Sequence, residues 1–173
     1  HQVWTGKGIA LSYSGRDQDA VSFFKKALGI DAKDARANYH FGVSLIRLGK
    51  YHEAIRHFDA ALAARPKCAQ AFFQKGRALA MLSMDREALV CYDRALALND
   101  TIADSWLYRG ISHASLGNYT EALADYERAL ALDSTSAPAC LYRGVALYHV
   151  GQYDEAIDSF SDALKMRPDY PEA

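Results

Sequence analysis

The chain has few cysteines and prolines among its 173 residues, and it has no long apolar run. Its three cysteines, Cys68, Cys91 and Cys140, are far apart and form no CxxC pair. An odd number of scattered cysteines argues against a disulfide framework and favours a reducing compartment, so a cytoplasmic location is expected. The four prolines lie at intervals rather than in a linker. No apolar run approaches the roughly 18 residues that a membrane span needs.

The charge balance is also unremarkable. A net charge of -1 and an isoelectric point near 6.6 give no general attraction to nucleic acid or to an anionic membrane. Half of the residues are hydrophobic and 24% are charged, which excludes a disordered chain and fits a soluble domain. The sequence opens on His1 rather than Met and carries no leader, so it is expected to be a piece of a longer chain.

Motifs that carry catalytic or metal chemistry are missing. There is no glycine-rich phosphate loop, no HExxH and no CxxC. His52 and His57 are five residues apart on a predicted helix and point to different faces, so no metal site is expected. Asp125 and Glu127 are interpreted as solvated helix positions, and Arg109 and Arg143 as partners in structural salt bridges. The sequence therefore predicts no catalytic residue, no metal and no cofactor, and a protein that is not an enzyme.

Glycine is unevenly placed, and its placement reveals an internal repeat. One column of glycines recurs every 34 residues, at Gly8, Gly42, Gly76, Gly110 and Gly144. A second column holds Gly15, Gly49, Gly117 and Gly151, with Ser83 in the remaining position. Nine of the eleven glycines fall in these two columns, which excludes a chance arrangement.

Alanines and aromatic residues keep the same 34-residue step. Two alanine columns contain Ala20, Ala54, Ala88, Ala122 and Ala156, and Ala27, Ala61, Ala95, Ala129 and Ala163. The column between them is aromatic, with Phe24, Phe58, Tyr92, Tyr126 and Phe160. Five repeats follow without insertion or deletion, at 1–34, 35–68, 69–102, 103–136 and 137–170, and residues 171–173 would begin a sixth. The whole chain is thus predicted to be one array.

Each repeat has the pattern of two helices. In the fourth repeat, Thr101 is expected to cap a first helix that runs to about Ser115, and Gly117 supplies the left-handed residue that ends it. Apolar residues at helical spacing predict a second helix over 119–132. Ser136 then has the character of the next helix start. Glycine inside a helix costs about 1 kcal/mol relative to alanine, so Gly8 predicts a close helix approach, with Ala20 as the expected neighbour.

These columns resemble a known repeat family. Its pattern is W-x2-L-G-x2-Y, then A-x3-F, then P, with a period of 34 residues. The first repeat matches it with Trp4, Gly8, Leu11, Ala20 and Phe24, and the fourth with Trp106, Gly110, Ala122 and Tyr126. Over essentially its full length the chain resembles the tetratricopeptide repeat family. The resemblance implies an all-α fold, an α-solenoid of five helix-turn-helix repeats that forms a right-handed superhelix.

The resemblance also implies a binding groove. In this family the first helix of each repeat forms the concave wall, and here the corresponding positions are rich in aromatic residues, which dominate protein interfaces. They indicate a groove for a peptide or an amphipathic helix of a partner protein. The alternative is that these aromatics pack against neighbouring hairpins or a missing helix. The predicted contact residues are Tyr39, His40, Phe73, Arg77, Leu107, Tyr108, Ile111, Leu141, Tyr142 and Tyr148.

One specialised groove of the family is absent. Its chaperone-tail binders clamp a terminal carboxylate with Lys and Asn, then Asn, then Lys and Arg, on successive repeats. The corresponding residues here are Thr5 and Ile9, then His40, then Gln70 and Gln74, so this clamp is not expected.

Two other functions compete with groove binding. Repeats one and two carry 11 Lys+Arg and 6 Asp+Glu, whereas repeats four and five carry 5 and 10. Such an asymmetry could join copies head to tail, which makes a self-assembling scaffold the first alternative. The second is a docking arm of a longer enzyme. The basic residues Arg36, Arg47, Lys50 and Arg56 could touch RNA, but too few aromatics lie between them to favour nucleic acid as a partner.

Overall fold

The structure, a computed structural model, describes residues 1–168, which contain ten α-helices and no β-strand. The helices come in pairs of similar length, each pair spaced 34 residues from the next. They are α1 (Gln2–Tyr13), α2 (Asp17–Ile30), α3 (Ala35–Arg47), α4 (Tyr51–Ala64), α5 (Ala69–Ala80), α6 (Asp85–Leu98), α7 (Ala103–Ser115), α8 (Tyr119–Leu132), α9 (Ala137–His149) and α10 (Tyr153–Met166). The end of the fifth predicted repeat and the predicted start of a sixth lie outside the described residues.

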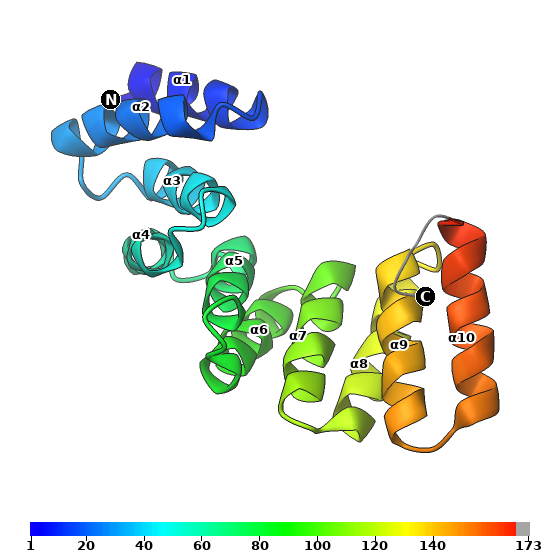
Figure 1. Ribbon diagram of the computed structural model, residues 1–173. Coiled ribbons are helices and arrows are strands. Elements are labelled where there is room, and N and C mark those ends of the chain that lie inside the picture. The colour runs from blue at the N-terminus through cyan, green and yellow to red at the C-terminus, as the bar shows by residue number, and fades with distance from the viewer. Residues whose placement is uncertain (169–173) are drawn as a thin grey trace. The chain divides into compact units, whose positions relative to one another are not determined.

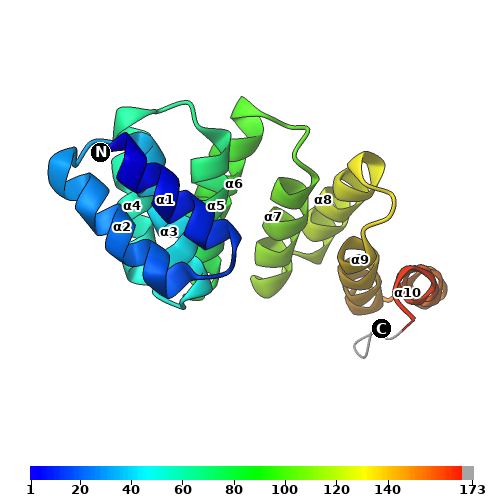
Figure 2. The same cartoon turned by 90° about the horizontal axis from the view of Figure 1, so that it is seen from above.

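The chain forms two compact units, residues 1–87 and 88–173, with their boundary inside α6. In the first unit, α1 packs against α2 and α3 against α4 as hairpins, and α2 and α4 each contact the first helix of the following repeat. In the second unit, α7 pairs with α8 and α9 with α10, and α8 also contacts α9. Figures 1 and 2 both show α1 beside α2 and α9 beside α10. The predicted helical hairpins are therefore confirmed.

The turn inside each hairpin requires a left-handed residue. Gly117 has φ +82°, a conformation that glycine adopts without steric cost, and the amide of the next residue, Asn118, donates to the carbonyl of His113 over 2.9 Å. Ser83 occupies the same position in the third repeat at φ 58°. The substitution of serine for glycine therefore leaves the turn in place but puts a side chain where it is disfavoured.

The mid-helix glycines face an aromatic ring rather than an alanine. A Cβ atom built on Gly8 would lie 2.7 Å from the ring of Phe24, and one on Gly110 would lie 2.6 Å from the ring of Tyr126. The expectation that Gly8 nests against Ala20 was therefore wrong. Gly42 and Gly144 likewise face the rings of Phe58 and Phe160, so in these four hairpins the glycine makes room for an aromatic ring of the second helix.

Helix starts follow the expected chemistry at two places and depart from it at a third. Asp34 caps α3 by accepting from the amides of Arg36 and Ala37, and Ser136 caps α9 by accepting from the amide of Ala139. Thr101 does not cap α7. Its amide and hydroxyl both donate to the side chain of Asn99 in the preceding turn, and α7 begins after Ile102.

One pair of facing positions, here called the hairpin slot, is filled in a different way in each of four hairpins. It holds Lys7 and Phe23, Phe41 and His57, Arg109 and Asp125, and Arg143 and Ser159. In the fourth hairpin Arg109 donates to both oxygens of Asp125 over 2.6 and 2.9 Å and to Asp93 over 2.7 Å. Asp125 is 2% exposed, so its interpretation as a solvated residue was wrong.

The predicted salt bridge of Arg143 was also wrong. Its Nε donates to the hydroxyl of Ser159 over 2.7 Å, and no carboxylate of the described residues lies within ion-pair distance. Serine stands where the fourth hairpin has Asp125, so the guanidinium borders a cavity of about 360 Å³ instead of contacting a buried carboxylate.

Candidate protein-binding surface

The first helices of the hairpins form one side of each unit, which we call the first-helix face. In the first unit α3 contacts both α1 and α5. The serine hydroxyls of Ser44 and Ser12 are 2.9 Å apart, and Arg47 donates to the carbonyl of Ser12 over 2.8 Å. These bonds fix α1 beside α3 and thereby set the spacing of the side chains on this face.

Tyr39 and His40 lie at the centre of the face of the first unit. The rings of Tyr39 and His40 are 5.0 Å apart, and Tyr13 of α1 meets the His40 ring at 6.1 Å. Burial raises the pKa of Tyr39, while a hydrogen bond from Gln74 and the nearby Arg77 oppose that rise. Burial lowers the pKa of His40, and the charges of Arg36 and Arg47 lower it further. This aromatic group is thus surrounded by cations.

A cavity of about 190 Å³ opens on this face. It is lined by residues from all three first helices of the unit: Ser12, Tyr13, Tyr39, His40, Val43, Arg47 and Gln74. Since the cavity crosses from α1 over α3 to α5, a bound chain here would contact successive repeats.

The second unit has a first-helix face of α7 and α9, which contact each other. Tyr142 is 37% exposed and Tyr148 is 59% exposed. The rings of Tyr142 and Tyr126 stack with centroids 6.2 Å apart, so Tyr142 is supported from below by the hairpin core. This face presents aromatic surface and, unlike that of the first unit, has no arginine beside it at the predicted groove positions.

The structure divides the ten predicted contact residues into two groups. Phe73, Leu107 and Leu141 are only 5–6% exposed, so they offer little accessible surface. Their side chains support the face from within. The remaining seven keep accessible surface: Tyr39, His40, Arg77, Tyr108, Ile111, Tyr142 and Tyr148.

The structure adds residues that were not among the predicted contacts. Arg36, Arg65 and Cys68 line a second cavity, of about 260 Å³, together with Tyr39 and His40. Arg36 occupies an inward position of a first helix and could be found from the repeat. Arg65 and Cys68 come from the end of α4 and the loop after it, which no first-helix pattern includes.

Within residues 1–168, no cluster of three or more His, Cys, Asp or Glu side chains could hold a metal ion. In the same residues no helix combines the length and apolarity needed to cross a bilayer.

Comparison with known families identifies the repeat. Models described as "Tetratricopeptide repeat" match residues 1–34, 39–83, 103–136 and 137–170. The chain belongs to the tetratricopeptide repeat family. The matched segments 1–34, 103–136 and 137–170 coincide with three of the five repeats predicted from the glycine columns.

Solved structures of tetratricopeptide repeat proteins have the same fold. A crystal structure of MamA is 24% identical, covers 96% of this chain and 97% of its own, and superposes with a TM-score of 0.85. MamA from Desulfovibrio magneticus RS-1 is 18% identical, with coverages of 98% and 96% and a TM-score of 0.88. YrrB, described as a TPR protein with an unusual peptide-binding site, is 26% identical, with coverages of 98% and 87% and a TM-score of 0.81. No curated protein sequence matches significantly.

Proposed function

We propose that this tetratricopeptide repeat protein is a non-catalytic scaffold that binds a peptide or helix of a partner protein on its first-helix face. The observation that carries the proposal is the cavity that crosses α1, α3 and α5 beside Tyr13, Tyr39 and His40. Aromatic side chains with an apolar body and a polar edge are favoured at protein interfaces. An extended segment lying across this face would cover them in turn.

Two further observations support the proposal. Tyr142 and Tyr148 extend the aromatic character to the first-helix face of the second unit. The similar protein YrrB is described as having a peptide-binding site, and tetratricopeptide arrays in general are protein-interaction scaffolds. Self-assembly and an attachment to a longer enzyme stay predictions.

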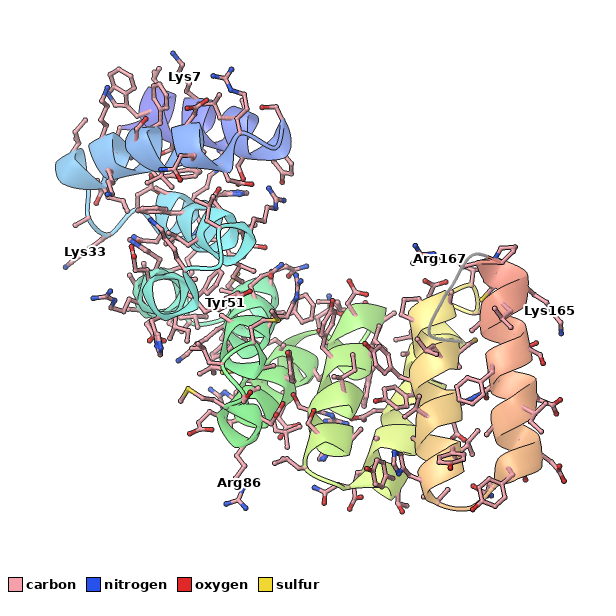
Figure 3. The ribbon with its side chains drawn as sticks, viewed as in Figure 1. Lys7, Lys33, Tyr51, Arg86, Lys165 and Arg167 are labelled. Carbon is pink, nitrogen blue, oxygen red and sulfur yellow. The ribbon has the colours of Figure 1, made fainter. Side chains whose placement is uncertain are left out.

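The proposal can be tested by affinity capture from an extract of the source cells. The bait would be the chain itself and a variant in which four face tyrosines, Tyr39, Tyr108, Tyr142 and Tyr148, are replaced by alanine. A control variant replaces Tyr51, which lies at the start of the second helix α4 and is labelled in Figure 3, by alanine. Circular dichroism would establish that all three chains are folded.

A captured protein would be identified by mass spectrometry, produced in pure form and titrated against each bait by calorimetry. We expect its affinity to fall by at least about tenfold for the face variant and to change little for the control, because aromatic anchors provide most of the binding free energy. Equal affinity for the face variant and the chain itself would contradict the proposal. Recovery of the chain alone would favour self-assembly.

A further inference from the structure

The first unit carries a pocket whose chemistry selects a kind of partner. The pocket, of about 260 Å³, lies between the start of α3 and the end of α4. Its lining combines Ala35, Ala61, Tyr39 and Cys68 with His40 and two arginines, Arg36 and Arg65. An apolar side chain fits the alanines and the tyrosine, whereas an anionic group fits the arginines.

Neighbouring hollows extend this pocket in two directions. A cavity of about 410 Å³ shares Arg36 and Arg65 with it and continues past Gln2 and Thr5 of α1. The cavity of about 190 Å³ shares Tyr39 and His40 with it and reaches Arg47 and Gln74. The three hollows are therefore neighbours in the first unit, and each has an arginine in its lining.

Arg36 and Arg65, the two arginines in the lining of the pocket, are available to a ligand. Among residues 1–168, neither Arg36 nor Arg65 has a carboxylate within ion-pair distance, and both are exposed. Arg47 is partly engaged, because it donates to the carbonyl of Ser12 and lies 3.4 Å from a carboxylate oxygen of Asp17, although 44% of its side chain is exposed. A guanidinium without a carboxylate partner offers paired donors with the geometry that a carboxylate accepts.

Asp34, whose carboxylate belongs to the lining of one of these hollows, already accepts hydrogen bonds from within the chain. Asp34 accepts from the backbone amides of Arg36 and Ala37 at the start of α3, and from the hydroxyl of Thr5 over 3.0 Å. It caps a helix and holds α1, and it makes no ion pair with Arg36 or Arg65. The lowered pKa of His40, to which Arg36 and Arg47 contribute, is consistent with an excess of positive charge here.

The positive charge distinguishes the first unit from the second. Six positions of each first helix are predicted to face the groove, and in the second repeat they hold Arg36, Tyr39, His40, Val43, Ile46 and Arg47. In repeats one to three these positions include three arginines, Arg36, Arg47 and Arg77, and no acidic residue. Repeats four and five have Asp104 at these positions and neither lysine nor arginine. A partner attracted by charge would therefore engage the first unit.

We infer that the first unit binds an acidic segment of a partner protein, with an apolar side chain in the pocket beside Tyr39 and Cys68 and flanking carboxylates on Arg36 and Arg65. The inference rests on the proposed binding function of the first-helix face and names the partner's chemistry. Recognition uses side-chain carboxylates within a segment, because Thr5, His40 and Gln74 stand where a clamp for a terminal carboxylate would need lysine, asparagine and arginine.

A displayed library of random twelve-residue peptides, selected on the whole chain, tests this inference. We expect the selected sequences to contain Asp or Glu on both sides of an apolar residue. The consensus peptide, made with an amidated C-terminus and a fluorescent label, would then be titrated by anisotropy. An Arg36→Gln/Arg65→Gln variant is expected to bind it at least about tenfold more weakly, with a reduced salt dependence.

The matched control is Lys50→Gln/Arg86→Gln, which removes the same charge from exposed positions of the first unit that line none of these hollows. Figure 3 shows Arg86 projecting away from the ribbon. The control is expected to weaken binding by less than about twofold, since its charges act only through screened solvent. Equal losses in the two variants would reduce the effect to overall charge and overturn the inference.

The outcomes separate this inference from the proposed function. Selected peptides without acidic residues that still lose affinity when Tyr39 is replaced by alanine would overturn the acidic partner while supporting the binding face. Acidic peptides that bind the Arg36→Gln/Arg65→Gln variant unchanged would overturn the assigned pocket. Selection of no peptide at all would count against both.

Discussion

The second and the fourth hairpins have the same backbone plan but fill the hairpin slot with opposite chemistry. In the second, the ring of Phe41 lies 4.2 Å from that of His57. In the fourth, Arg109 donates hydrogen bonds to both oxygens of the buried carboxylate of Asp125. The difference shows that the 34-residue period specifies helices, turns and close approaches, while the contact across the slot is free to vary from one repeat to the next.

The two solutions make different demands on their surroundings. Burial lowers the pKa of His57, which favours the neutral ring, and Nδ1 of that ring lies 2.9 Å from the side-chain oxygen of Asn38. Asp125 is buried within a unit in which Arg109 supplies its counter-charge. Removing one member of a buried ion pair strongly lowers the stability of the fold, because the other charge is left unpaired. A histidine that is buried in its neutral form instead lowers the stability when it takes up a proton.

The largest expected effect comes from Arg109→Met. It leaves the carboxylate of Asp125, 3% exposed as a side chain, without its cation, and should lower the free energy of unfolding by about 3–5 kcal/mol. The equivalent Arg143→Met removes only a hydrogen bond to Ser159 and should cost about 1 kcal/mol. Urea unfolding followed by circular dichroism measures both.

Equal losses in the free energy of unfolding for Arg109→Met and Arg143→Met would contradict the difference between the two hairpins. A second change, Arg109→Met with Asp125→Leu, serves as the control because it removes the stranded carboxylate together with its partner. This double variant should recover much of the lost stability. If it is no more stable than Arg109→Met alone, the loss comes from packing rather than from an unpaired charge.

The sequence predicted the hairpins well because each signal in it acts locally. Gly117 ends a helix through its own backbone, and the apolar spacing between 119 and 132 predicted α8 with the bounds that the structure has. Gly8 was recognised as a close approach, but its neighbour is Phe24. The period cannot distinguish a ring from a methyl group as the neighbour, since both Ala20 and Phe24 recur with it.

The surface was less predictable because exposure depends on tertiary packing. Phe73 and Tyr39 occupy the same column of the repeat, yet Phe73 is 6% exposed and Tyr39 is half-buried. Asp125 has the polar character of a solvated residue, and only the proximity of Arg109 across the hairpin explains its burial. Arg65 reaches the same cavities as Arg36 from another helix, which a helix-by-helix pattern does not reveal.

A smaller effect is expected from Ser159→Asp, which would rebuild in the fifth hairpin the pair seen in the fourth. The new carboxylate would replace the serine hydroxyl that now accepts from Arg143. We expect a gain of about 1 kcal/mol in the free energy of unfolding, limited by repulsion from the nearby Glu127 and Asp158. Ser159→Asn is the matched neutral control. An aspartate variant no more stable than the asparagine variant would show that the slot differs in geometry as well as in residue type.

The smallest effect is an acid sensitivity of the second hairpin. Burial is the main cause of the lowered pKa of His57, with Arg56 and Lys25 adding to it and Glu53 opposing it. Because the folded-state pKa lies below the unfolded value of about 6.5, the unfolded chain takes up the proton first. The stabilisation is therefore complete above pH 6.5 and is lost as the pH falls below that value. Urea midpoints measured between pH 7.5 and 5.5 should decline less steeply for His57→Gln than for the unchanged chain. Glutamine keeps a hydrogen-bonding side chain but does not titrate. His40, whose pKa is also lowered, contributes to the decline in both chains. If the midpoints of both chains decline equally with pH, the fold accommodates the charged form of His57 as well as the neutral form. The second and fourth hairpins would then differ in the shape of the slot and not in its response to charge.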